Sequence, residues 1–115
     1  MQIRKTYQKI NPELLYAEIR DFAFKQGAFL KESRLETYTQ PDESANFVSR
    51  GTLIFRPEGE EGKDSRECLR VHIVGGVRAE TKLMIDLDEK LFPEAKVTAL
   101  MSDVDFIFAS YEEDE

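Results

Sequence analysis

Cys68 and His72 are the only cysteine and the only histidine of the chain, and their side chains are those of a thiolate–imidazole pair. Both residue numbers are even, so on one β-strand the two side chains would point to the same face. Their Cα atoms would nevertheless lie about 13 Å apart, which is too far for a direct hydrogen bond. We therefore expect Cys68 to serve as a small apolar filler and His72 to be a solvated or hydrogen-bonded histidine of a sheet.

Other short patterns are typical of ion or phosphate sites but are incomplete. Asp86 and Asp88 begin like a calcium-binding loop, but Val97 stands at the twelfth position, where such a loop needs glutamate. A Gly-Lys pair at 62–63 resembles the end of a phosphate-binding loop, yet Asp64 follows it in an acidic segment. One histidine and one cysteine cannot complete a structural zinc site. We predict no metal site, no cofactor and no catalytic residue, and no reaction is identified.

A larger group of residues with binding chemistry follows from the alternation between Leu69 and Leu87. Odd-numbered residues there are apolar or small, and most even-numbered residues are polar or charged. A period of two over such a length is typical of β-structure with one face on a core. With the flanking strands in the same phase, the even-numbered face collects the basic residues Arg34, Arg50, Arg56, Arg70, His72, Arg78 and Lys82. The apolar residues expected there are Leu30, Tyr38, Val48, Ile54, Cys68, Val74 and Met84.

This mixture is typical of an interaction surface. Apolar patches with polar rims mark binding sites on protein surfaces, and arginine binds carboxylates or phosphates bidentately. The binding residues that we expect are Arg34, Tyr38, Arg50, Arg70, His72 and Lys82. In the alternative interpretation, these cations pair with Glu32, Glu36, Glu80 and Asp86. The loop over 58–67 or the N-terminal strand would then cover the apolar residues.

Three functions are compatible with this face. The first, which we favour, is a non-enzymatic interaction domain that forms a homodimer or binds an acidic partner protein, since arginine and methionine are enriched at such interfaces. The second is a pocket for a small anion or an amphipathic ligand between the sheet and the C-terminal helix, with Arg50, Arg70 and His72 as orienting groups and an enzyme as a special case. The third is single-stranded nucleic-acid binding, which needs stacking aromatics, and only Tyr38 is well placed for that.

The composition narrows the choice of partners. The chain of 115 residues has a net charge of −7, which argues against duplex nucleic acid and against an anionic membrane surface. Its content of 41% hydrophobic residues is enough for a core. A single cysteine fits a reducing cytosol, and residues 1–9 contain no apolar segment typical of a signal peptide. We therefore expect a cytoplasmic protein that does not bind membranes.

The elements that would hold this face in place follow from capping and periodicity. Asn11 suits an N-cap, Pro12 the first helical position and Gly27 the C-terminus of a helix. A two-residue turn at Gly75 and Gly76 would set apolar residues opposite charged ones, so we place the turn at 76–80, with one of these glycines in a bulge or at positive φ. The expected strands cover 2–9, 29–39, 47–56, 68–74 and 82–87, and the expected helices cover 12–26 and 93–111.

The order β-α-β-β-β-β-α predicts a single α+β domain over residues 1–115. We expect two layers, an antiparallel sheet with two long helices on one face, and an acidic tail over 112–115 that frays. The element order resembles that of TATA-box-binding-protein-like domains and, more loosely, that of helix-grip ligand-binding domains. This resemblance covers the whole chain in topology and includes no shared motif, so it implies a fold and no function.

Overall fold

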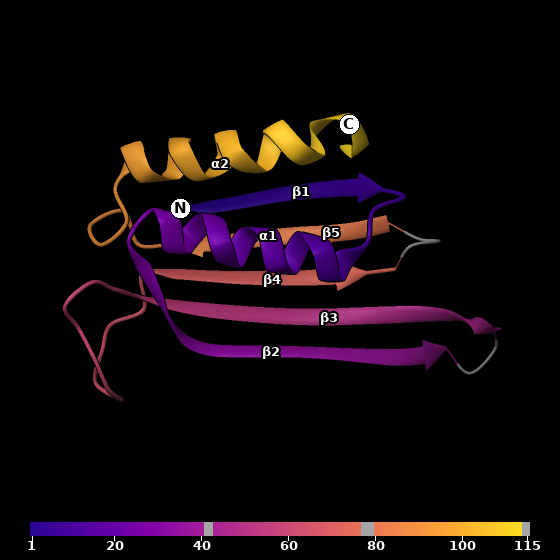
Figure 1. The fold of residues 1–115 in the computed structure, drawn as a ribbon, viewed down its shortest axis with the longest axis horizontal. Helices are drawn as coiled ribbons and strands as arrows, with labels where there is room; N and C mark the ends of the chain where they lie inside the picture. Colours follow the sequence, from indigo (N-terminus) through magenta and orange to yellow (C-terminus); the bar gives the residue numbers. More distant parts are fainter. Residues whose placement is uncertain (41–42, 77–79, 114–115) are drawn as a thin grey trace.

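The computed structural model describes the backbone of residues 1–40, 43–76 and 80–113, and their side chains except at 40 and 43–46 (Figure 1). The strands are β1 (Gln2–Gln8), β2 (Ala28–Gln40), β3 (Glu43–Pro57), β4 (Leu69–Gly75) and β5 (Glu80–Leu87), and the helices are α1 (Pro12–Lys25) and α2 (Glu94–Phe108). A short 3-10 helix, Ala109–Tyr111, follows α2. No helix within these ranges is long and apolar enough to cross a membrane.

The five strands form one antiparallel sheet in the order β1-β5-β4-β3-β2. Together with the two helices, this sheet confirms the predicted α+β class. The N-terminal strand β1 lies at one edge, beside β5, and β2 lies at the other edge (Figure 1). Sequence neighbours therefore pair throughout the sheet except at β1, whose partner comes from the far end of the chain.

Helix α1 begins and ends where its sequence predicts. The side chain of Asn11 accepts a hydrogen bond of 2.9 Å from the backbone N–H of Glu13, and Pro12 occupies the first turn. Gly27 follows the last residues of the helix at a φ of +83°, a conformation that favours glycine because it has no Cβ. These two signals set the first and last residues of α1, directly before β2 begins.

One hydrophobic core joins the sheet to both helices. The odd-numbered residues Val71, Ile73, Leu83 and Ile85 are buried, as the alternation of β4 and β5 predicts. We call their side of the sheet the odd face and the opposite side the even face. The helix residues in the same hydrophobic cluster are Leu15, Tyr16, Ile19, Ala23, Val97, Leu100, Val104 and Phe108.

The β4–β5 pair keeps odd-numbered residues opposite odd-numbered residues, with Ile73 opposite Leu83. The two glycines have a different role from the expected one, because neither Gly75 nor Gly76 has a positive φ and the register between the strands is continuous. A Cβ at Gly75 would collide with Thr81, and a Cβ at Gly76 would lie 2.5 Å from the carbonyl oxygen of Phe47. Close approach therefore explains both glycines. The centre of the turn, residues 77–79, lies outside the described residues.

The start of the acidic tail differs from the expected frayed end. Glu112 forms an isolated β-bridge with Tyr7, and the backbone N–H of Glu113 donates to the carbonyl oxygen of Thr6 at 2.8 Å. The Glu112 carboxylate also accepts a hydrogen bond of 2.7 Å from Lys5 Nζ. The chain after α2 is thus held against the outer side of β1 by backbone and side-chain contacts.

Candidate functional site: the even face of the sheet

Across the sheet, even-numbered residues pair with even-numbered residues in continuous rows. The pairing of β1 with β5, β5 with β4 and β4 with β3 keeps this parity, and β2 joins it from Glu32 onward. The first row is Gln2, Asp86, Arg70, Ile54 and Glu32; the second is Arg4, Met84, His72, Thr52 and Arg34; the third is Thr6, Lys82, Val74, Arg50 and Glu36. The even face therefore mixes basic, acidic, hydroxyl and apolar side chains in a fixed order, with the carboxylates of Asp86 and Glu32 in the first row and that of Glu36 in the third.

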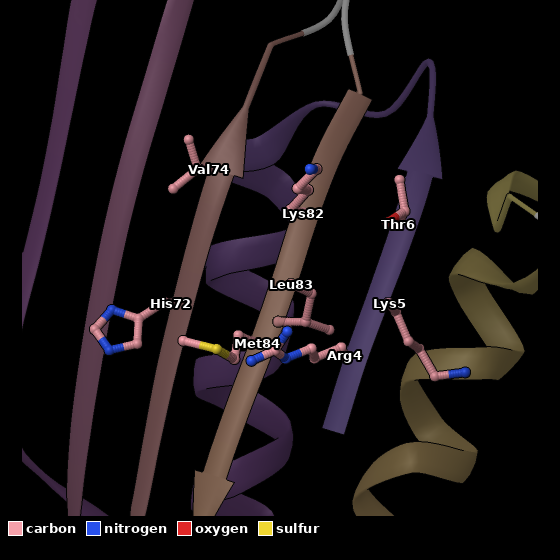
Figure 2. A pocket seen from close by; sticks show the side chains of 8 residues that line it. All are labelled: Arg4, Lys5, Thr6, His72, Val74, Lys82, Leu83 and Met84. Carbon is pink, nitrogen blue, oxygen red and sulfur yellow. The ribbon is translucent and has the colours of Figure 1, made fainter. Parts of the chain in front are cut away.

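An open depression with a volume of about 560 Å³ lies over β1, β5 and β4 on this side of the sheet (Figure 2). Its lining residues are Arg4, Lys5, Thr6, His72, Val74, Lys82, Leu83 and Met84. Figure 2 shows Arg4, Met84 and His72 side by side on three neighbouring strands, and Thr6, Lys82 and Val74 in a second row. Cationic and hydroxyl groups thus surround a floor that is partly apolar.

Two of the cations that line the depression, Arg4 and Lys82, have no ion-pair partner among the described residues, whereas Lys5 pairs with Asp105 and Glu112. Among the described residues, no carboxylate lies within 4.0 Å of the charged groups of Arg4 or Lys82. The only side-chain partner given to Arg4 by the described residues is Gln2, whose amide oxygen accepts from Arg4 Nε at 2.8 Å. Both side chains are exposed, so an anion from solution or from a partner can reach them.

His72 lies at the border of the depression rather than at its centre. Its Nδ1 is 3.4 Å from the hydroxyl oxygen of Thr52, and Figure 2 shows the ring on the β3 side of β4. The ring is half-buried and lies in the same row as Met84 and Thr52. This placement fits the expected hydrogen-bonded sheet histidine.

Cys68 does not lie on the even face as expected. Its side chain is fully buried in the hydrophobic cluster, immediately before β4 begins. Burial raises the pKa of the Cys68 thiol to about 11, so the thiol stays protonated and weakly reactive at neutral pH. The residue is therefore a small apolar filler of the core, and the thiolate–imidazole pair has no basis in the structure.

The remaining predicted binding residues are spread over the face. Arg70 is held by Glu67, whose carboxylate accepts from Arg70 Nη2 at 2.6 Å and from Nε at 3.1 Å. On the edge strand β2, both Arg34 and Tyr38 approach Glu36; Arg34 Nε is 3.6 Å from that carboxylate, and the Tyr38 hydroxyl donates to it. Arg50 lies between Glu36 and Val74. Of the six expected residues, the structure brings only His72 and Lys82 into the depression.

The expectation for Leu30 is wrong. Leu30 pairs with the buried Phe55, ahead of a register shift between Leu30 and Glu32, and so lies outside the even-numbered rows. The register shift is the physical reason, because a one-residue insertion reverses the parity of a strand. Arg56 keeps the parity of Ile54 in β3 but lies at the end of the sheet, where it donates to the carbonyl oxygen of Glu60 at 2.5 Å. Arg78 lies outside the described residues.

In the alternative interpretation, the loop over 58–67 or the N-terminal strand covers the apolar residues of the even face. In the structure, this cover reaches only one end of the face. The loop over 58–67 contacts that end, where its Ser65 carbonyl oxygen accepts from Lys31 Nζ at 2.6 Å. The N-terminal strand joins the sheet as β1 and so does not lie across it. Val74 is accordingly 36% exposed. Internal pairing thus accounts for Arg34 and Arg70 and leaves the depression open.

Arg4 and Thr6 are the functional candidates that sequence reasoning missed. Both belong to β1, whose weak alternation predicts an edge strand but not which strand lies beside it. Once β1 pairs with β5, Arg4 lies opposite Met84 and Thr6 opposite Lys82. The even numbers of both residues were the only available signal.

The depression has the chemistry of anion recognition with an apolar contact. Guanidinium, ammonium and hydroxyl groups donate hydrogen bonds, and Met84 and Val74 offer apolar surface. Within the described residues, no group of three or more His, Cys, Asp or Glu side chains is arranged to hold a metal ion. No family model, curated protein or solved structure matches this chain, so the face is interpreted from its own side chains.

Proposed function

We propose that this chain is a non-enzymatic interaction domain that binds an acidic segment of a partner protein on the even face. In this proposal both long helices cover the odd face, in the element order β-α-β-β-β-β-α. The even face of the sheet is then left as the binding surface. The observation that carries the proposal is the pair of cations Arg4 and Lys82, which have no carboxylate partner among the described residues, beside the exposed Val74. The buried free thiol of Cys68 suits a reducing, cytoplasmic setting.

An acidic partner suits this face better than a second even face. Two copies stacked through their depressions would bring the Arg4 and Lys82 side chains of both copies into one dry layer, which costs free energy because like charges repel in a low dielectric. A segment with glutamate or aspartate on one face would neutralise the same cations. Alternating or helical spacing of acidic and apolar side chains would also cover Met84 and Val74.

The energetics require both kinds of contact. Exposed ion pairs contribute roughly 0.2–1 kcal/mol each, so Arg4, Lys82 and His72 alone cannot hold a partner firmly. Burial of apolar surface contributes roughly 25 cal/mol for each Å² removed from water, and Val74 and Met84 supply such surface. We therefore expect a weak, salt-sensitive complex of the kind formed by transient partners.

A small amphipathic anion is the second candidate, and the size of the depression favours it. A volume of about 560 Å³ lies within the range of small-molecule sites. In this version the orienting groups are Arg4, Lys82 and His72, since Arg70 is engaged by Glu67 and Arg50 lies beside the depression. The openness of the site on a sheet face makes it the second choice, because ligand pockets usually bury most of the ligand.

The test uses a labelled peptide of alternating glutamate and leucine and, as a control, a lysine–leucine peptide of equal length. We expect the wild-type chain to bind the acidic peptide in a fluorescence-anisotropy titration and to lose affinity as salt is added. The double variant Arg4→Glu/Lys82→Glu should bind about tenfold more weakly or worse. The matched control Arg20→Glu/Lys90→Glu makes the same change in net charge at exposed residues outside the depression, and should bind like the wild type.

Two outcomes would contradict the proposal: no binding of the acidic peptide by the wild-type chain, or equal weakening by both double variants. Native mass spectrometry of gently purified protein separates the second candidate from the first. A discrete small-molecule adduct on the wild type that is lost in Arg4→Glu/Lys82→Glu would favour the small anion.

A further inference from the structure

The two edges of the sheet are protected very differently. On the outer side of β1, the Tyr7–Glu112 bridge and the hydrogen bond from Glu113 to Thr6 occupy part of the backbone. The other edge strand, β2, spans 13 residues, and within the described residues β3 is its only neighbour in the sheet. Figure 1 shows β2 as the outermost strand, on the side away from α2. Long open edges of this kind present unpaired N–H and C=O groups to another strand.

The central part of β2 is regular and exposed. Register shifts occur between Leu30 and Glu32 and between Thr39 and Gln40, so an unbroken stretch runs between them. Within that stretch Leu35 is 42% exposed and Tyr38 is 49% exposed. Proline and inward-pointing charged side chains often prevent such an edge from pairing. Residues 32–39 contain no proline, and the uncharged Ser33, Leu35 and Thr37 lie on their odd face.

The sequence of this stretch is complementary to itself when read in reverse. In an antiparallel pair of two β2 strands with the two-fold axis at Leu35, each residue faces the residue equally far on the other side of Leu35. Arg34 of each copy then faces Glu36 of the other, which gives two reciprocal ion pairs. Ser33 faces Thr37, and Leu35 faces its own copy, so every opposing pair near the axis is favourable.

We propose that the partner of the β2 edge is a second copy of this chain, paired antiparallel through residues 32–38 with Leu35 on the two-fold axis. In the single chain, Arg34 Nε lies 3.6 Å from the Glu36 carboxylate of the same strand. Pairing adds a second opposite charge to each of these groups without burying an unpaired one. The backbone of the edge gains its missing hydrogen bonds, and the interface is isologous, as a closed dimer requires.

This dimer would form one continuous sheet of ten strands. Its two-fold axis is perpendicular to the sheet, so the even faces of both copies point to the same side and both depressions remain open. The inference goes beyond the proposed function and does not depend on it, because the residues of the β2 edge and those of the depression are different. A bivalent surface for an acidic partner would follow if both are correct.

The experiment uses two single charge reversals, Arg34→Glu and Glu36→Arg, and sedimentation velocity over a concentration series. We expect a concentration-dependent wild-type dimer, with the dissociation constant raised about tenfold or more in each single variant because like charges then oppose each other twice. A mixture of the two single variants should form a heterodimer, since each position 34 then faces an opposite charge at position 36. The double variant Arg34→Glu/Glu36→Arg should dimerise with itself for the same reason.

The outcomes are separable from those of the peptide experiment. Wild-type chain that stays monomeric at all concentrations would overturn the inference, as would a dimer that neither single reversal weakens. Loss of dimer in the single variants without recovery in the mixture and in the double variant would overturn the Leu35-centred register. The variant Arg4→Glu/Lys82→Glu serves as a control, because it should dimerise like the wild type whether or not the acidic peptide binds. Circular dichroism confirms that each variant is folded.

Discussion

The two faces of the sheet are built from the same strands but meet different surroundings. On the odd face, the side chains of β4 and β5 are buried under residues of both helices in one hydrophobic cluster. On the even face, the neighbouring residues of the same strands remain exposed or half-buried and include Lys82 and His72, and Arg4 of β1 is exposed beside them. Within β4 and β5, alternation therefore separates the residues that stabilise this fold from those that are free to bind, because successive side chains point to opposite faces.

The largest expected effect comes from truncating the core side of this comparison. Leu83→Ala should lower the free energy of unfolding by about 2–5 kcal/mol, because Leu83 is buried in the cluster and its loss leaves a cavity. Val74→Ala, on the even face of the adjacent strand, should cost less than about 1 kcal/mol, because Val74 is already partly in water. Urea denaturation monitored by circular dichroism measures both. Equal losses would mean that something covers the even face in solution.

A smaller effect is expected within the even face, between two cations that differ in their partners. Lys82→Glu should weaken binding of the glutamate–leucine peptide about tenfold, because Lys82 lines the depression and pairs with no carboxylate in the part of the chain that the structure describes. Arg70→Glu should weaken it much less, because Arg70 is held by Glu67 in the neighbouring row. The comparison is made by anisotropy at low salt. An Arg70→Glu variant as weak as Lys82→Glu would enlarge the site to include the first row.

Local signals in the sequence were enough to predict the helices and strands and, for most strands, which residues lie on which face. The cap at Asn11, the glycine at 27 and the alternation from Leu69 to Leu87 each act within a few residues, and the structure follows all three. The alternation also excludes a two-residue turn at Gly75 and Gly76, because the apolar pattern fixes the register of the two strands. The close contacts that require these glycines involve Thr81 and Phe47, which no local pattern connects to them.

The candidate site was predictable only in part, because it depends on long-range pairing. His72 and Lys82 lie on β4 and β5, which follow each other in the sequence and pair with each other, so one pattern covers both. Arg4 reaches the same depression only because β1 pairs with β5, and the choice of that partner carries no local signal. The misplacement of Leu30 has a similar cause, since an irregularity between Leu30 and Glu32 changes parity without an evident mark in the sequence.

The smallest expected effect concerns Tyr7, a residue of the odd face that lies beneath the end of α2. Tyr7 is fully buried against Phe108, and its hydroxyl oxygen has no hydrogen-bond partner among the described residues. Tyr7→Phe should therefore raise the free energy of unfolding by about 0.5–1 kcal/mol at neutral pH, since it removes a buried polar group that is unsatisfied. Urea denaturation at pH 7 measures the change, and a clear loss of stability would show that the hydroxyl has a partner in solution.

The same substitution should also reduce the sensitivity of the fold to alkali. Burial, with the nearby carboxylates of Glu112 and Asp105, raises the pKa of the Tyr7 phenol above its ordinary value of about 10. Because the pKa is higher in the folded chain, the contribution of the neutral phenol is complete below about pH 10 and is lost as the pH rises beyond that value. The pKa of Lys5 is also raised, since its contacts with Glu112 and Asp105 outweigh its partial burial, and it loses its contribution in the same direction. The difference in free energy of unfolding between the wild type and Tyr7→Phe isolates the contribution of the phenol. The variant should therefore gain stability relative to the wild type between pH 10 and pH 11. A constant difference across that range would place the Tyr7 hydroxyl in water.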